Sequence, residues 1–334
     1  MKLVVFVTGL CHRKCFYCPL SREKRWRDVC YANERPITSD LDLLKEAEEM
    51  DARGAGFTGG DPLLRPERTL RFLKLLKENF EDFHIHLYTT PGHHLTDGIL
   101  SSLAKAELDE LRLHPELTDA SATASYVKKA KREGLTVGIE VPALPGEVKL
   151  LIDLVRSAEE AGADFVIVNE LEMNEENAFQ LRARGLRIKR GSLSAVEGSE
   201  ETALDLLSFI ESELSLSSHY CPAALKDSYQ YKNRLKRMAI RKAKPHEEVT
   251  EDGLLRKGII TGEVGRLRAL TKLLSLRFGV PSHMLFLNES KGELELPVPT
   301  LKVAKRHGIL SGLKAYIVEE YPTFNRRRAT QDPV

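Results

Sequence analysis

Short runs of branched apolar residues alternate with amphipathic stretches over the first half of the chain. A strand-like run is followed six times by a segment with helical spacing of its apolar residues. The strand-like runs are 3–7, 55–58, 85–88, 111–113, 137–141 and 165–168, and the helical segments are 39–53, 67–79, 96–104, 120–133, 148–161 and 175–184. Repeated units of this kind build a parallel sheet with helices outside it. The pattern predicts an α/β fold with a partial (β/α)6 barrel rather than a closed eight-stranded one.

The alternation of strand-like and helical segments ends after residue 196. We expect a helix at 200–216, a serine-rich turn, and a long helix from Pro222 to just before Pro245. A mixed pattern follows, with strands at 258–261, 284–287, 293–296 and 315–319 and a helix at 264–278. The predicted parts are a barrel core at 1–196, a helical extension at 197–250, a small α+β module at 251–322 and a loose tail at 323–334.

The composition is that of a globular protein. The 334 residues are 42% apolar and 30% charged, with a formal net charge of +1. No apolar run approaches the roughly 20 residues that a membrane span needs. Five cysteines, three of them clustered, suit a reducing compartment better than a disulfide framework, so a cytoplasmic protein is expected.

The clustered cysteines follow the first strand as Cys11-x-x-x-Cys15-x-x-Cys18, with Tyr17 directly before the third. Three thiolates can hold a [4Fe–4S] cluster by three irons and leave the fourth iron open, whereas a closed structural site normally uses four protein ligands. The alternative is a zinc site with a distant fourth ligand, such as His12 or Cys30. Loops at the carboxyl ends of parallel strands usually carry the functional residues. An iron with an open coordination position on this loop therefore predicts a catalytic site rather than a structural one.

The cysteine segment CHRKCFYCPL resembles the signature of the radical SAM superfamily. A second match, Gly59-Gly60-Asp61-Pro62, follows the second strand, with Asp61 where glutamate is common in that family. The resemblance implies a [4Fe–4S] cluster held by the three cysteines and S-adenosylmethionine (SAM) as cofactors. It also implies reductive cleavage of SAM to a 5′-deoxyadenosyl radical, with the backbone around Tyr17 beside the adenine and the Gly-Gly-Asp segment at the amino group of SAM.

Further contacts to SAM are expected from residues at later strand ends. The candidates are Thr89 and Thr90, His114 and Glu116, Glu140, and Asn169 and Glu170. The alternative for Glu140 is a side chain on the polar face of a strand. The pair His93-His94 is expected to lie in a solvated turn rather than to bind a metal.

The segment His219-Tyr220-Cys221 precedes the long helix. Near a helix N-terminus the pKa of Cys221 would be lowered, which makes it a candidate catalytic thiolate or hydrogen-atom donor. The alternative is a small buried residue at a domain junction. The helix itself is rich in lysine and arginine between 226 and 244, with Tyr229 and Tyr231 among them, so it could track RNA phosphates or simply be a solvated helix.

Three functional hypotheses follow. The first is a radical SAM enzyme of unknown substrate, with modification of RNA, above all tRNA, as one form. The second keeps that chemistry for an activase or a small-metabolite enzyme, since the layout is similar to relatives of the pyruvate formate-lyase activating enzyme and to a chiefly archaeal branch. The third is a non-enzymatic zinc or iron–sulfur RNA-binding protein. The first two imply a one-electron donor of flavodoxin or ferredoxin type.

Overall fold

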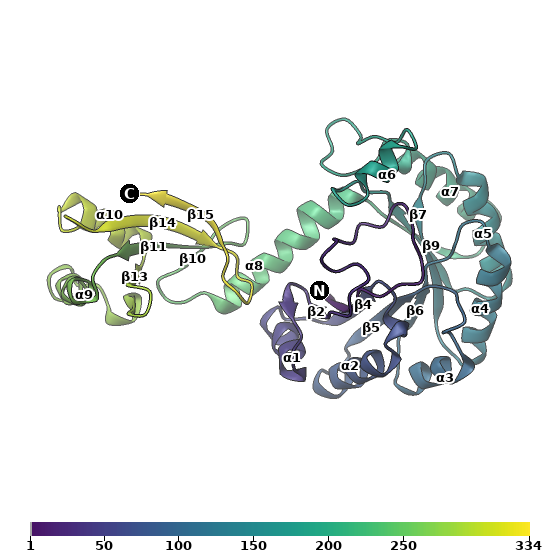
Figure 1. Cartoon of the computed structure of the whole chain (residues 1–334), viewed down its shortest axis with the longest axis horizontal. Helices are drawn as coiled ribbons and strands as arrows, with labels where there is room; N and C mark the ends of the chain where they lie inside the picture. Colours follow the sequence, from purple (N-terminus) through teal and green to yellow (C-terminus); the bar gives the residue numbers. More distant parts are fainter. Residues whose placement is uncertain (1) are drawn as a thin grey trace. The chain divides into compact units, whose positions relative to one another are not determined.

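The computed structural model describes residues 2–334, apart from the side chains of 226–228 (Figure 1). The chain divides into two compact units. The first comprises the chain up to Glu48 with Ala52–Tyr229, and the second comprises Glu49–Asp51 with Gln230–Val334.

The first unit is built on the six predicted parallel strands, which confirms the partial barrel. They are β1 (Lys2–Thr8), β4 (Gly54–Gly59), β5 (His84–Thr89), β6 (Glu110–Leu113), β7 (Val137–Ala143) and β8 (Phe165–Glu170). The intervening helices cover the outer face of the curved sheet (Figure 1). They are α1 (Asp40–Glu49), α2 (Pro66–Asn79), α3 (Asp97–Lys105), α4 (Ala120–Arg132) and α5 (Val148–Glu160).

The sheet is longer than the sequence predicts. Its order is β3-β2-β1-β4-β5-β6-β7-β8-β9, with a short hairpin of β2 (Tyr31–Ala32) and β3 (Arg35–Pro36) at one edge. At the other edge β9 (Ser217–Cys221) pairs in parallel with β8, so the expected serine-rich turn is wrong and a seventh parallel strand replaces it. Between β8 and β9 lie α6 (Ala178–Arg182) and α7 (Ser199–Glu213).

The two faces of the sheet differ in chemistry because side chains alternate along each strand. The face toward the helices is apolar and fully buried, as at Leu87, Leu111 and Val168. The opposite face is polar: His86 and Tyr88 contact each other along β5, and Arg112 of β6 lies over the Tyr88 ring. This polar face is the inner surface of the partial barrel, which we call the lumen.

The second unit begins with α8 (Tyr231–Lys242), which follows a π-helical turn, η2 (Leu225–Gln230). The single helix expected from Pro222 is therefore shorter and interrupted. The sheet that follows is antiparallel, in the order β12-β13-β11-β14-β15, and β10 also pairs with β11. Its strands are β10 (Glu248–Val249), β11 (Leu255–Thr261), β12 (Phe286–Asn288), β13 (Glu293–Leu296), β14 (Lys314–Glu320) and β15 (Arg328–Pro333).

Two helices, α9 (Val264–Phe278) and α10 (Val298–Arg306), complete a β-α-β-β-α-β module of ferredoxin-like topology. Between α9 and β12 lies a 3-10 turn, η3 (Ser282–Met284). Apolar residues of both helices form one core with the sheet, among them Leu267, Leu274 and Leu301. The expected α+β module is present, but α10 was not predicted. The expected loose tail is wrong at Arg328–Pro333, because these residues form β15 against β14.

Candidate active site

The cysteine loop leaves β1 at its carboxyl end and is closed at its base by Gly9. The Gly9 N–H donates to the carbonyl of Arg27 at 2.9 Å, and the Trp26 N–H donates to the carbonyl of Gly9 at 2.7 Å. A Cβ at Gly9 would stand 1.7 Å from the Lys24 carbonyl oxygen, so only glycine fits. The sequence from 9 to 27 therefore folds back on itself and presents its cysteines from a fixed base.

The three cysteines are partly exposed thiols without disulfide bonds. Burial raises the pKa of Cys11 and Cys15, so a bound metal must displace their protons. Thiolates around one zinc ion lie roughly 3.8 Å apart, given a Zn–S bond of about 2.3 Å. Among the described residues, only His246, Glu247 and Glu295 bring ligand atoms within 4.8 Å of one another. In the cysteine loop, the number of ligands favours a cluster: three thiolates can hold a cluster with one open iron, whereas a closed zinc site normally uses four protein ligands.

The Gly-Gly-Asp segment lies at the end of β4, beside the start of the cysteine loop. The N–H of Gly60 donates to the Thr8 carbonyl and the N–H of Asp61 to the Leu10 carbonyl, both at 2.7 Å. A Cβ at Gly60 would stand 2.2 Å from the Leu10 carbonyl oxygen. The two strand ends approach so closely that this position requires glycine whether or not a ligand is bound.

The carboxylate of Asp61 is fully buried and bonded within the protein. It accepts from Thr89 Oγ1 at 2.7 Å and Thr90 Oγ1 at 2.6 Å, and it pairs with His94 Nε2 at 3.0 Å. Burial alone would raise the pKa of Asp61, but His94 and the two threonines outweigh it and lower the pKa. The contact of Asp61 and Thr89 with SAM stays a prediction, since their side chains bond to each other here. The pair His93-His94 lies in a turn and His93 is exposed as predicted, but His94 belongs to this buried network and is not solvated.

Tyr17 and His114 form a pair between the cysteine loop and the end of β6. Tyr17 Oη lies 3.0 Å from His114 Nε2, and His114 Nδ1 lies 3.0 Å from the Glu140 carbonyl oxygen. Since a carbonyl only accepts, Nδ1 carries the proton and Nε2 accepts from the tyrosine hydroxyl. Burial, with a smaller contribution from Arg13, lowers the pKa of His114 to about 4, so the ring is neutral at pH 7. This neutral histidine fixes Tyr17 next to Cys18.

Glu140 and Asn169 meet at the ends of β7 and β8. Asn169 Nδ2 donates to Glu140 Oε1 at 2.6 Å, and Arg112 Nη1 lies 3.4 Å from the other carboxylate oxygen. Arg112 Nη1 also donates to the Tyr88 hydroxyl at 3.0 Å. The structure thus brings the predicted Tyr17, His114, Glu140 and Asn169 to one end of the lumen, where their contact with SAM stays a prediction.

The other residues predicted to contact SAM from strand ends make their bonds outside this group. Glu116 pairs with Arg13 at 3.7 Å, and Glu170 accepts from the N–H of Ala223 at 2.7 Å. Cys221 ends β9 in register with Asn169, so it lies on the lumen face, and the helical segment begins two residues later at Ala223, close to a helix N-terminus as expected. Its catalytic role stays a prediction.

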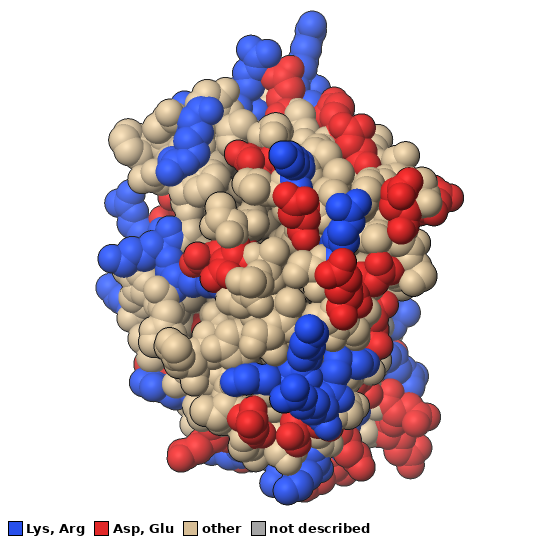
Figure 2. Space-filling view, turned by 90° about the vertical axis from the view of Figure 1, so that its right-hand side faces the viewer, with Lys and Arg blue, Asp and Glu red and all other residues tan. Residues whose placement is uncertain are grey.

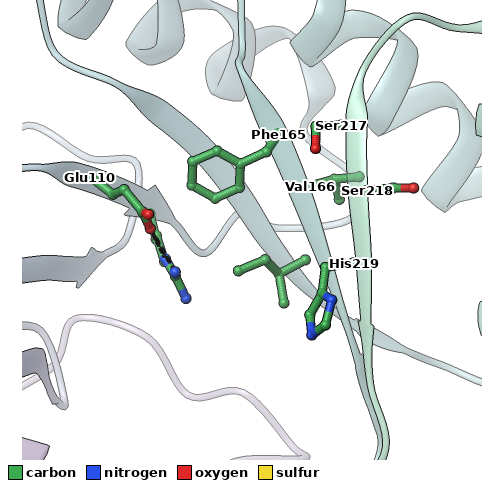
Figure 3. Close-up of a pocket in the computed structure, with 8 residues that line it drawn as sticks. Glu110, Phe165, Val166, Ser217, Ser218 and His219 are labelled. Carbon is green, nitrogen blue, oxygen red and sulfur yellow. Dashed lines mark hydrogen bonds and ion pairs between the residues drawn. The ribbon is translucent and has the colours of Figure 1, made fainter. Parts of the chain in front are cut away.

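Sequence reasoning missed the charged residues deeper in the lumen. Arg112 pairs with Glu110 at 2.6 Å, and Lys2 lies 2.9 Å from His86 Nδ1. The signal was present as alternating polar positions, His84-x-His86-x-Tyr88 and Glu110-x-Arg112-x-His114, which a strand places on one face. Beside Arg112 a cavity of about 230 Å³ opens along β8 and β9 (Figure 3). Its lining includes Phe165, Ile167, Ser217 and His219.

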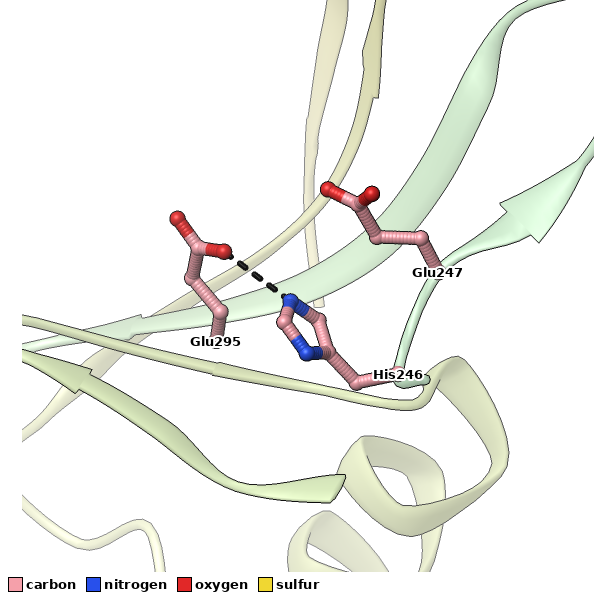
Figure 4. Close-up of side chains that lie close together, drawn as sticks. All are labelled: His246, Glu247 and Glu295. Carbon is pink, nitrogen blue, oxygen red and sulfur yellow. Dashed lines mark hydrogen bonds and ion pairs between the residues drawn. The ribbon is translucent and has the colours of Figure 1, made fainter. Parts of the chain in front are cut away.

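Among the described residues, one group of three side chains brings its possible ligand atoms close enough together to bind a single metal ion, and it lies in the second unit (Figure 4). His246 Nε2 lies 2.9 Å from Glu295, but Lys257 Nζ lies within 3.3 Å of Glu247, 3.1 Å of Glu295 and 3.0 Å of Glu320. The ammonium therefore neutralises the carboxylates that a cation would need. Burial opposes ionisation of Glu295, yet His246 and Lys257 outweigh it and lower its pKa to about 2. We read the group as a buried ion-pair cluster.

None of the helices in the described part of the chain is both long and apolar enough to cross a membrane. The model of one protein family, described as the Radical SAM superfamily, matches residues 5–156. A protein of Methanocaldococcus jannaschii named "putative glycyl-radical enzyme activating enzyme" is 37% identical, over 100% of this chain and 90% of that protein. A "probable GTP 3′,8-cyclase" of Methanopyrus kandleri is 28% identical over 53% of this chain and 54% of its own length. Among solved structures, Streptococcus suis SuiB has a TM-score of 0.48 and 16% identity, over 68% of this chain and 50% of SuiB.

The fold presents three free thiols on one loop at the carboxyl ends of a parallel sheet, where α/β enzymes of this kind carry their active sites. The chain belongs to the radical SAM superfamily, which confirms the resemblance of its cysteine loop. Its cofactors are those of the family, a [4Fe–4S] cluster and SAM. The residues fit them: three partly exposed thiols stand on one loop, and polar side chains gather at the adjoining strand ends.

Proposed function

We propose that this enzyme is an activase that installs a radical on a glycine of a partner protein. The observation that carries the proposal is the 37% identity, along the whole chain, to the relative named as a glycyl-radical enzyme activating enzyme. The lumen is consistent with such a substrate. It offers charged and amide side chains, Arg112, Glu140 and Asn169, that can bond to the main-chain groups of an extended peptide.

In this proposal Cys11, Cys15 and Cys18 hold the cluster and leave one iron for SAM. When bound, the cluster and SAM supply the one-electron chemistry that removes a hydrogen atom from a substrate carbon. The pair of Tyr17 and His114 holds the cysteine loop against β6 and β7. Phe165 and Ile167 on β8 give the cavity beside the polar row a partly apolar wall.

RNA, the substrate class suggested by the basic helix, finds no support among the relatives. On that helix Lys232 pairs with Asp252 at 2.7 Å, so part of its charge is neutralised within the protein. We also propose that the electron donor is a flavodoxin or a ferredoxin.

The test uses anaerobic, iron-loaded protein with SAM, a reductant and a glycyl-radical enzyme encoded by the same genome. We expect an electron paramagnetic resonance doublet of a carbon-centred radical coupled to a glycine α-hydrogen, formed together with an equivalent amount of 5′-deoxyadenosine. Replacing that glycine by alanine in the partner should abolish the signal. Release of 5′-deoxyadenosine over many turnovers with a small molecule, and no protein radical, would instead assign the enzyme to metabolite chemistry.

A further inference from the structure

Two segments that are distant in sequence are joined around the cysteine loop. Asn177 Nδ2 donates to the Tyr17 carbonyl and Asn174 Nδ2 to the Pro19 carbonyl, both at 2.9 Å, so the two contacts flank Cys18. The guanidinium of Arg184 lies 4.1 Å from the centre of the Phe16 ring, next to Cys15. The segment around α6 therefore forms one surface with the loop that carries the cluster ligands (Figure 1).

Both segments are strongly basic although the whole chain has a net charge of only +1. Residues 9–27 contain six lysines and arginines against one acid, Glu23, and residues 178–191 contain five against none. Several nearby acids are already paired: Glu176 with Arg22, Glu116 with Arg13, Glu197 with Arg187 and Glu200 with Lys189. Figure 2 shows a face of the molecule that carries both signs of charge, with acidic and basic side chains side by side over most of it and one group of basic side chains below its middle.

Four exposed cations of these two segments have no carboxylate partner among the described residues. They are Lys14, Arg182, Arg184 and Arg190, which we call the basic collar. Two apolar side chains of the same segment are also exposed, Phe179 by 79% and Leu193 by 90%. A charged rim with exposed apolar groups is suited to a protein partner of opposite charge.

We propose that the basic collar docks an acidic one-electron donor protein against the cysteine loop. The inference rests on membership of the radical SAM superfamily and is independent of the activase proposal. One electron leaves the reduced flavin or iron–sulfur centre of the donor and arrives at the three-cysteine site. The donor is oxidised by one electron, the acceptor is reduced by one, and no bond is made or broken. Transient redox complexes bury little area and depend on charge for encounter, which fits a surface with unpaired cations.

The decisive variant is Lys14→Glu/Arg182→Glu/Arg190→Glu, which leaves the contact of Arg184 with Phe16 intact. Its matched control, Lys128→Glu/Arg132→Glu/Lys149→Glu, makes the same charge change at exposed positions on α4 and α5. Iron content and reduction by dithionite should be the same in both proteins, which shows that the site is loaded and accessible.

Reduction by an excess of an acidic flavodoxin is followed by stopped-flow absorbance, and binding by calorimetry, at low and high salt. At low salt we expect the collar variant to be reduced at least about 10-fold more slowly than the control and to bind more weakly. The difference should disappear near 1 M salt, where charges more than about 3 Å apart are screened. Equal rates at low salt would overturn the proposal. So would a collar variant that loses binding of tRNA but keeps its rate with flavodoxin, since the surface would then belong to a nucleic acid.

Discussion

His114 shows how a single residue of this site depends on its burial. Its ring is held between the Tyr17 hydroxyl and the Glu140 carbonyl and needs only one proton to satisfy both. With a folded pKa of about 4, it stays neutral where an unfolded histidine, with a pKa near 6.5, would already be charged.

This difference predicts a pH dependence of stability. Between pH 4 and about pH 6.5 the unfolded chain binds a proton at His114 that the folded chain does not, so unfolding becomes easier as the pH falls through this window. From pH 7.5 to 5 the wild type should lose about 1–2 kcal/mol more than His114→Gln. Urea unfolding followed by the fluorescence of Trp26, the one tryptophan, measures this. Equal losses in the two proteins would contradict it, and His283→Gln at an exposed site is the control.

The residue types in the sequence predicted where the candidate site lies better than they predicted which bonds each of its residues makes. The three cysteines and Gly59-Gly60 could be read directly, because their chemistry and spacing carry the information. Asp61 could not, because its partners Thr89, Thr90 and His94 come from the end of β5 and the turn after it, and only the folded sheet brings them together. Asp61 holds two strand ends together in the structure, and its contact with SAM stays a prediction.

Within the cysteine loop, the backbone is packed most tightly at its base, around Gly9. Gly9→Ala would drive a Cβ into the carbonyl oxygens of Lys24 and Arg27, at 1.7 Å and 2.7 Å. We expect the variant to open the loop and lose most of its iron, measured per chain after anaerobic reconstitution.

The control for this loss is Gly98→Ala in α3, where the nearest atom to a new Cβ is 3.9 Å away. It should keep its iron and gain up to about 1 kcal/mol, because alanine favours a helix over glycine. A Gly9→Ala protein with full iron content would show that the close packing at the base of the cysteine loop is not needed to bind iron.

The elements that the sequence failed to predict share a physical cause. Ser217–Cys221 lacks the branched apolar residues that mark a strand, and Arg328–Pro333 is exposed along its length. Both are edge strands, held by backbone pairing with β8 and β14 rather than by a buried face of their own. The central strands bury apolar side chains under helices, so a run of apolar residues in the sequence predicts each of them.

At the scale of the whole molecule, the chain divides into two units with different internal chemistry. The second depends on a buried ammonium, Lys257, which is 3% exposed and meets three carboxylates. Lys257→Met would remove the one ammonium that these three carboxylates share, while Glu247 would keep Arg326 and Glu295 would keep His246.

We expect Lys257→Met to lower the free energy of unfolding of the second unit by about 3–5 kcal/mol, the usual cost of removing one partner from a buried ion pair. Calorimetry should show this loss while the iron content of the first unit is unchanged. Lys302→Met, at an exposed position of α10, should have no effect. An unaltered transition in Lys257→Met would mean that the cluster adds nothing to stability.

The three-cysteine loop is expected to hold the cluster that cleaves SAM. The most direct measurement is iron content together with 5′-deoxyadenosine release after anaerobic reconstitution, with dithionite and SAM, for the wild type and Cys15→Ala. We expect about four irons per chain and 5′-deoxyadenosine in the wild type, and neither in the variant. A colourless, zinc-only protein that stays inert after reconstitution would contradict it.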